Sequence, residues 1–144
     1  VARIAMGANP QQTLQALREA EAYPGPSLII AYSHCIAHGI DMEQGLQQQK
    51  RAVAAGHWPL IRYNPVIREE GGVPFTLDCL RPTLPLAEYR KHEGRFQSLA
   101  RENPEEAKRL MTIAQQMAYQ RWDLYEKMAT SSAAAFPPDS RRDT

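Results

Sequence analysis

One short segment of the sequence gathers residue types that can do chemistry. The stretch SHCIAHG, residues 33–39, places a single thiol, Cys35, between two imidazoles. A nucleophilic cysteine needs a base within hydrogen-bond reach and a third group to orient that base, and nothing nominates the third group. A structural zinc site needs four nitrogen or sulfur ligands, and Cys35, His38 and the distant Cys79 do not form a recognised spacing. The third alternative is a small buried hydrophobic residue, since free cysteine is often buried.

The first third of the sequence predicts the elements that position this segment. Residues 1–6 form an apolar run of strand length. Asn9 and Pro10 suit the start of a helix, because asparagine is a good N-cap and proline fits the first helical position. The helix should end before the Pro-Gly-Pro breaker at 24–26, and the unalternating apolar run at 27–32 is typical of a parallel strand covered on both faces. This order predicts a βαβ unit.

This unit determines where Cys35 lies. In a parallel pair, residues 7–9 and 33–35 both leave their strands at the carboxyl edge of the sheet. Open α/β sheets bind ligands at that edge, so the position of Cys35 is more informative than its presence. Gly7 and Asn9 could approach a cofactor from the same edge, but turn and cap chemistry already explain both residues.

The middle of the chain completes the predicted α/β domain, which we place at residues 1–80. Asp41 can cap a helix that ends before Gly56. Two further strands are expected at 60–63 and 73–77, with a turn at 69–72 between them.

Residues 81–130 are predicted to form a C-terminal helical extension. One helix starts at Leu84, and Glu93 interrupts its apolar face. A second helix starts with the capping pair Asn103-Pro104. Its main packing stripe is expected at Leu110, Ile113, Met117, Leu124 and Met128, with Trp122 and Tyr125 on a neighbouring stripe. Residues 131–144 are small, polar and proline-containing, which predicts a disordered tail.

The composition argues against several classes of function. Seventeen basic and sixteen acidic side chains leave a net charge of +1, which gives no electrostatic case for nucleic acid or a membrane surface. The longest apolar run, residues 28–32, is too short to span a bilayer. Two cysteines argue against a disulfide framework and favour a reducing, cytoplasmic setting. The sequence opens on a strand at Val1 rather than on Met, so we expect a piece of a longer protein.

Several segments together resemble the C-terminal part of pyruvate:ferredoxin (flavodoxin) oxidoreductases. They are residues 1–8 (VARIAMGA), 25–36 (GPSLIIAYSHCI), 54–60 (AAGHWPL) and 74–78 (PFTLD), followed by the helices. The match is colinear and covers most of residues 1 to 128. The resemblance implies the end of a thiamine diphosphate-binding α/β domain, with an incomplete sheet, followed by helices.

The resemblance also implies an activity and its cofactors. Enzymes of this family oxidatively decarboxylate pyruvate with thiamine diphosphate and Mg²⁺ and pass the acyl unit to coenzyme A. Their electrons travel through [4Fe-4S] clusters to ferredoxin or flavodoxin. Cys35 matches the fourth cysteine of the cluster nearest the thiamine, and iron–sulfur clusters are held by cysteine thiolates. Cys35 is therefore the one cofactor-binding and metal-ligating residue expected in this chain.

By the same resemblance, most of the active site lies elsewhere in the longer protein. The GDG-containing thiamine–Mg²⁺ motif and the three other cluster cysteines are expected upstream of Val1. No catalytic residue is assigned to this chain, and alone it is expected to be inactive. Its partners are the remainder of the same polypeptide, ferredoxin or flavodoxin, and a second copy in a homodimer.

Other residues of this region have a simpler interpretation. His34 could tune a cluster by hydrogen bonding, but a packed, satisfied histidine is the commoner case, and the same holds for His38 and His57. Cys79 is expected to be a spectator. The alternative for the whole chain is a stand-alone, non-catalytic interaction or assembly module that kept the fold and lost the chemistry.

Overall fold

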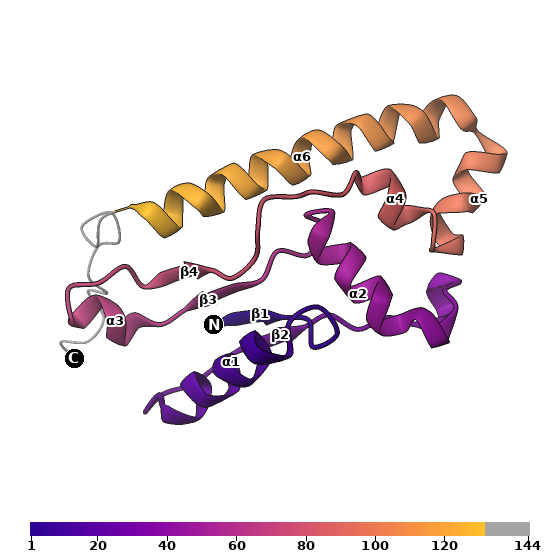
Figure 1. Cartoon of the computed structure of the whole chain (residues 1–144). Coiled ribbons are helices and arrows are strands. Elements are labelled where there is room, and N and C mark those ends of the chain that lie inside the picture. The colour runs from indigo at the N-terminus through magenta and orange to yellow at the C-terminus, as the bar shows by residue number, and fades with distance from the viewer. Residues whose placement is uncertain (132–144) are drawn as a thin grey trace.

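The computed structural model describes residues 1–131 and begins with the predicted βαβ unit (Figure 1). Strand β1 (Ala2–Ile4) leads into helix α1 (Pro10–Ala22) and then strand β2 (Ile29–Ala31). The two strands are parallel, with Ala2 paired to Ile29. Asn9 caps α1 as predicted, because its Oδ1 accepts a hydrogen bond from the Gln12 amide at 2.9 Å.

The complete sheet is mixed rather than parallel throughout. Strands β3 (Ile61–Tyr63) and β4 (Phe75–Leu77) extend it in the order β2-β1-β3-β4, and β3 runs antiparallel to both β1 and β4. A short helix α3 (Pro65–Glu69) and the predicted turn join β3 to β4, with Gly71 in the left-handed region at φ 82°. So short a connection cannot return the chain for a parallel pair, which explains the antiparallel arrangement.

The segment between β2 and β3 contains two 3₁₀ turns and one helix. Turn η1 (Ile36–His38) follows Cys35, and turn η2 (Met42–Gln44) leads into helix α2 (Gly45–Ala54). Asp41 is a cap as predicted, but it caps η2, since its Oδ1 accepts from the Glu43 amide at 3.0 Å. The α-helix therefore begins later than the sequence predicts.

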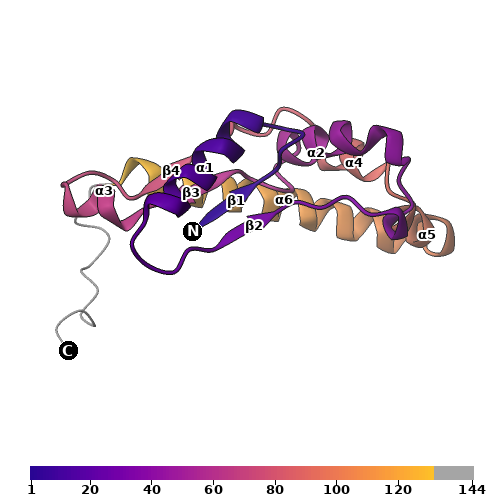
Figure 2. The ribbon, with the colours of Figure 1, turned by 90° about the horizontal axis from the view of Figure 1, so that it is seen from below.

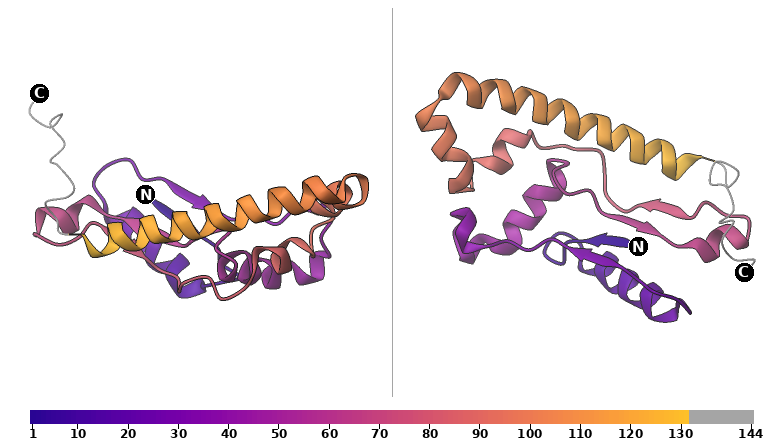
Figure 3. Two further views of the ribbon diagram at one scale, coloured as in Figure 1. Left: turned by 90° about the horizontal axis from the view of Figure 1, so that it is seen from above. Right: turned by 180° about the vertical axis from the view of Figure 1, so that it is seen from behind.

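Three helices complete the described chain: α4 (Leu86–Arg90), α5 (Gly94–Glu102) and α6 (Pro104–Thr130). The single helix expected from Leu84 is broken at Glu93, whose backbone is extended at φ −125°. Asn103 caps α6 as predicted, accepting from the Glu106 amide at 3.1 Å. Helix α6 runs along almost the whole length of the molecule (Figure 3). The predicted tail lies, apart from Ser131, outside the described residues.

The core consists of two small clusters rather than one large one. Ala52, Ala55, Leu86 and Tyr89 form the first, and Ala2, Ile4 and Ala16 the second. The main stripe predicted on α6 is largely uncovered, since Leu110, Ile113, Met117 and Leu124 are exposed and Met128 is half-buried. Trp122, from the predicted neighbouring stripe, is buried together with Ala118. Helix α6 therefore turns its other face to β4 and α4. Within residues 1–131, no helix is long and apolar enough to cross a membrane.

The outer edge of the sheet is open. Within the described chain no strand pairs with the far side of β2 (Figure 2). Around this edge Leu28 is 55% and Ile30 41% exposed, although the sequence predicted a strand covered on both faces. An uncovered apolar edge strand is a surface that other backbone can pair with.

Candidate functional site

The structure places Cys35 where the βαβ unit predicts, in the loop that follows β2 at the carboxyl edge of the parallel pair. The residue is partly exposed and its thiol is free. Its carbonyl accepts from the His38 amide at 3.0 Å, which closes η1, while its sulfur forms no hydrogen bond within residues 1–131. The backbone of η1 therefore fixes the loop that carries the thiol.

Gln49 of α2 joins the two turns that leave the parallel strands. Its Oε1 accepts from the Gly7 amide at 2.7 Å, and its Nε2 lies 3.1 Å from Nδ1 of His34. The side chain is 95% buried. The predicted approach of the turns after β1 and β2 is confirmed, but the residue that ties them comes from α2. Sequence reasoning missed Gln49, because a glutamine in an amphipathic helix carries no distinguishing signal.

His34 is packed against the first residue of α2. A Cβ built on Gly45 would lie 2.2 Å from Nε2 of His34, far inside van der Waals contact. Gly45 itself has ordinary helical dihedrals, so its backbone does not require glycine. The absence of a side chain at position 45 therefore serves to seat the His34 ring, as the packed-histidine interpretation expected.

Gly45→Ala should therefore destabilise the protein, although alanine in a helix is normally favoured over glycine by about 0.5–1 kcal/mol. The added methyl group displaces His34 and breaks its contact with Gln49. In the double variant H34A/G45A the clash is absent, so alanine at position 45 should make the double variant more stable than H34A alone. Denaturant unfolding of the four proteins measures this sign change. Equal effects of G45A in both backgrounds would contradict the packing described.

A buried polar network lies beneath the Cys35 loop. The hydroxyls of Tyr32 and Tyr89 are hydrogen bonded at 2.9 Å, and Tyr32 donates to Oε1 of Glu93 at 3.3 Å. Gln48 donates to the same oxygen at 3.2 Å, and Arg95 donates to Oε2 at 2.6 Å. Glu93 is completely buried. Glu93, which in the sequence interrupts an apolar helix face, is therefore the centre of this network.

The network keeps Glu93 ionised. Burial by itself raises the pKa of this carboxyl, but hydrogen bonds from Tyr89 and Gln48, together with the charge of Arg95, outweigh burial and hold the pKa below its usual range. The same surroundings raise the pKa of the Tyr89 hydroxyl, first through burial and then through its hydrogen bond to Glu93. Tyr89 is therefore a neutral hydrogen-bond donor beside a buried carboxylate.

His57 stacks on Tyr89, with ring centroids 4.5 Å apart and planes 25° apart. Burial lowers its pKa from 6.5 to about 4, and nearby Arg90 and Arg121 act in the same direction against the attraction of Glu93. His57 is therefore a packed, neutral histidine, as the simpler interpretation expected. His38 differs, because its buried Nδ1 has no hydrogen-bond partner within residues 1–131.

Acid should destabilise the protein through His57. The unfolded chain binds a proton near pH 6.5, whereas the folded protein does so only near pH 4, so stability present above pH 6.5 is lost as the pH falls through this window. Denaturant unfolding at pH 7.5 and pH 4.5 should show a smaller loss for His57→Gln than for the unaltered protein. His92→Gln, at an exposed histidine, should change nothing. The same loss in all three proteins would contradict a packed, neutral His57.

Cys79 is half-buried beside the backbone of Leu60. Its sulfur accepts from the Leu60 amide at 3.3 Å, and burial raises the pKa of the thiol to about 11. A thiol protonated in this way is a poor nucleophile and a poor metal ligand. Within residues 1–131, no three histidine, cysteine or acidic side chains come together to hold a metal ion. The described residues alone therefore do not provide the ligand set of a four-iron cluster.

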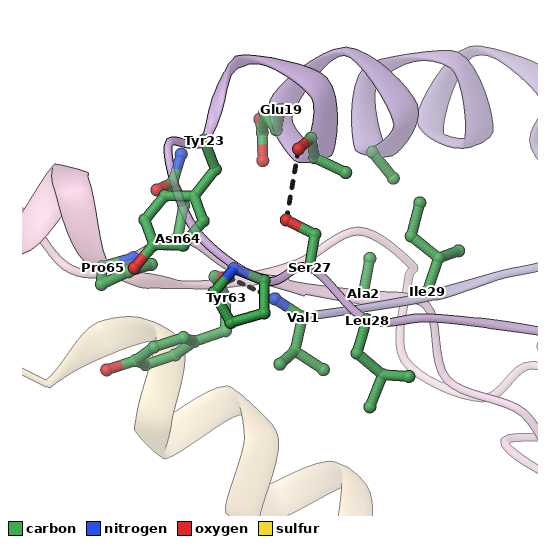
Figure 4. Close-up of a pocket in the computed structure, with 13 residues that line it drawn as sticks. Val1, Ala2, Glu19, Tyr23, Ser27, Leu28, Ile29, Tyr63, Asn64 and Pro65 are labelled. Carbon is green, nitrogen blue, oxygen red and sulfur yellow. Dashed lines mark hydrogen bonds between the residues drawn. The ribbon is translucent and has the colours of Figure 1, made fainter.

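A pocket of about 200 Å³ lies at the opposite, amino edge of the parallel strands (Figure 4). The Val1 nitrogen at its mouth donates to the Tyr63 carbonyl at 2.9 Å. Ser27 donates to the Ala20 carbonyl at 3.2 Å. These groups already have partners, and the pocket is separated from Cys35 by the length of the strands.

The fold and site define a class: an α/β unit with an open sheet edge that carries one thiol at the carboxyl edge of its parallel strands. No family model matches the sequence. Curated relatives include a pyruvate-flavodoxin oxidoreductase of Nostoc sp., 48% identical over 130 residues, and a pyruvate:ferredoxin oxidoreductase of Moorella thermoacetica, 47% identical over 129 residues. Another, from Trichormus variabilis, is 50% identical over 129 residues. Each match covers 90% of this chain.

This chain is homologous to one segment of the pyruvate:ferredoxin (flavodoxin) oxidoreductases. It spans only 11% of the length of each of these relatives. The resemblance seen in the sequence is confirmed, and so is the match to a fragment of a much longer protein.

Proposed function

We propose that this chain is the C-terminal part of a pyruvate:ferredoxin (flavodoxin) oxidoreductase. Such an enzyme converts pyruvate and coenzyme A to acetyl-CoA and CO₂ and releases two electrons, which pass through [4Fe-4S] clusters to ferredoxin or flavodoxin. The observation that carries the proposal is identity of 47–50% to three such relatives over nine tenths of the chain. Pyruvate, coenzyme A and the electron acceptor are then partners of the whole protein, in the cytoplasm.

Within that enzyme, the role assigned to this chain is to supply Cys35 as one ligand of a [4Fe-4S] cluster. Three features support this role: the sulfur has no hydrogen-bond partner within residues 1–131, it is partly exposed, and it lies at the carboxyl edge of the parallel pair. When bound, the cluster accepts and releases single electrons. The chain's own residues hold the loop that carries the thiol in place. Thiamine diphosphate, Mg²⁺ and the other three cysteines belong to the rest of the polypeptide.

The open surfaces support a place inside a larger protein. The uncovered β2 edge offers backbone for a further strand, and Leu28 and Ile30 offer apolar area beside it. Helix α6 turns Met117 and Leu124 outward, at 61% and 55% exposed. We assign these surfaces to contacts with the remainder of the polypeptide and with a second copy in a homodimer, because apolar patches of this kind mark interaction sites.

The test is to produce the full-length protein anaerobically and to measure reduction of ferredoxin or flavodoxin. Reduction should require both pyruvate and coenzyme A, and CO₂ should form in the same reaction. A full-length product that binds neither iron nor thiamine diphosphate would overturn the proposal. A start codon directly before Val1, with no coding frame further upstream, would instead support the stand-alone interaction module.

A further inference from the structure

We propose that Glu93 and Gly94 form a clamp that positions the Cys35 loop for its ligand, with Glu93 as the positioning residue. The inference rests on the proposed role of Cys35 as a cluster ligand. Glu93 and Gly94 follow α4 at a sharp corner and open α5. They contact the Cys35 loop at both of its ends.

The first contact holds the start of the loop. Tyr32 continues the parallel ladder, donating its amide to the Ile4 carbonyl at 2.9 Å, and it lies three residues before Cys35. Its hydroxyl donates to Oε1 of Glu93 at 3.3 Å, and its ring packs on Trp58 in a T-shaped arrangement with 5.5 Å between centroids. The last fixed residue of the strand is thereby tied to the Glu93 carboxylate.

The second contact holds the end of the loop. The Gly39 carbonyl accepts from the Gly94 amide at 3.1 Å. Gly39 has φ 68°, a region that other residues rarely adopt, and a Cβ on it would lie 2.9 Å from the Gly94 Cα. The two backbones meet this closely because neither residue carries a side chain. The Cys35 loop is thus fixed at both ends, at Tyr32 by Glu93 and at Gly39 by Gly94.

The clamp is rigid because the Glu93 carboxylate is buried and both of its oxygens accept hydrogen bonds. Glu93 has no exposed surface, and it accepts from Tyr32, Gln48 and Arg95, which belong to three different parts of the chain. A buried charge with several well-placed donors is costly to move, since each displaced donor would be left unsatisfied. The position of the Cys35 loop is therefore set by α2, α4 and α5 as well as by the strand before it.

The test uses the full-length protein with its clusters assembled. Two variants, Glu93→Gln and Tyr32→Phe, each weaken the link between strand end and carboxylate, and Tyr32→Phe keeps the ring on Trp58. Partner groups that orient a metal ligand typically contribute about 10- to 100-fold in metal affinity, so we expect iron release to an external chelator to become about 10-fold faster. The reduced-state electron paramagnetic resonance spectrum should broaden as the loop takes several positions.

A matched control separates this effect from a general loss of stability. Glu88→Gln changes the same residue type on α4, where the side chain is exposed and pairs only with Lys91 within the described chain. It should leave chelation rate and spectrum unchanged. If the Glu93 and Tyr32 variants match the control while Cys35→Ser loses iron, the clamp is wrong and the ligand role stands. If Cys35→Ser also retains its iron, the proposed function itself falls.

Discussion

Replacing Cys35 by serine in the full-length protein should remove a whole cluster. A four-iron cluster held by four thiolates does not persist at full occupancy with three, so the iron content should fall by about four atoms per chain. Electron delivery to ferredoxin should fall with it. Thiamine diphosphate binding should stay largely in place, because its motifs are expected outside this chain. Iron analysis, acceptor reduction and cofactor titration measure the three quantities.

Cys79→Ser provides the matched control for this result. Cys79 is a thiol in the same chain, but its sulfur is occupied by the backbone of Leu60 and its pKa is raised. Iron content and acceptor reduction should equal those of the unaltered protein. An unchanged iron count and unchanged ferredoxin reduction in Cys35→Ser would exclude Cys35 as a ligand.

Tyr89→Ala should be the most destabilising substitution in the described chain. Tyr89 is completely buried in the larger core cluster, stacks on His57 and contacts Phe96 at 6.5 Å between ring centroids. Removal of a buried aromatic ring typically costs about 3–5 kcal/mol, because the cavity it leaves closes only in part. Chemical denaturation of the variant and the unaltered protein under identical conditions measures the difference.

Two further substitutions divide this loss into its parts. Tyr89→Phe keeps the ring and removes only the hydroxyl, which bonds Tyr32 and Glu93, so it should cost about 1–3 kcal/mol, the penalty for leaving a buried polar group unsatisfied. Tyr119→Ala removes the same residue type from a 40% exposed position on α6 and should have a small effect. A Tyr89→Ala variant no less stable than Tyr119→Ala would mean that the cluster around Tyr89 is not a core.

Local signals in the sequence were sufficient for the first part of the fold. Asn9 and Pro10 determine the start of α1 through a cap and a fixed dihedral angle, and both act within a few residues. Strand-length apolar runs on either side of this helix make a parallel pair the expected outcome, and that pair places Cys35 at its edge. The cap at Asn103 is equally local, and it too was predicted correctly.

Longer-range features could not be predicted in the same way. Nothing near β3 indicates that it pairs with β1 in the antiparallel sense, because that pairing depends on how the whole chain returns. On α6 the predicted main stripe is largely exposed and the neighbouring stripe with Trp122 packs instead, since apolar periodicity does not distinguish a core from a surface awaiting a partner. In the sequence, Gln49 is an ordinary glutamine and Glu93 is a charge that interrupts an apolar face. Only the tertiary contacts reveal which groups these two residues hydrogen bond.

The clamp contact has a consequence for the order of events during synthesis. Tyr32 and Glu93 are 61 residues apart, so the Cys35 loop has been made long before the corner that fixes it has left the ribosome. Domains fold as units as the chain emerges, and a contact this distant in sequence forms only after its second half is available. With the proposed role of Cys35 as a cluster ligand, cluster insertion should follow translation through the α4–α5 corner rather than accompany it.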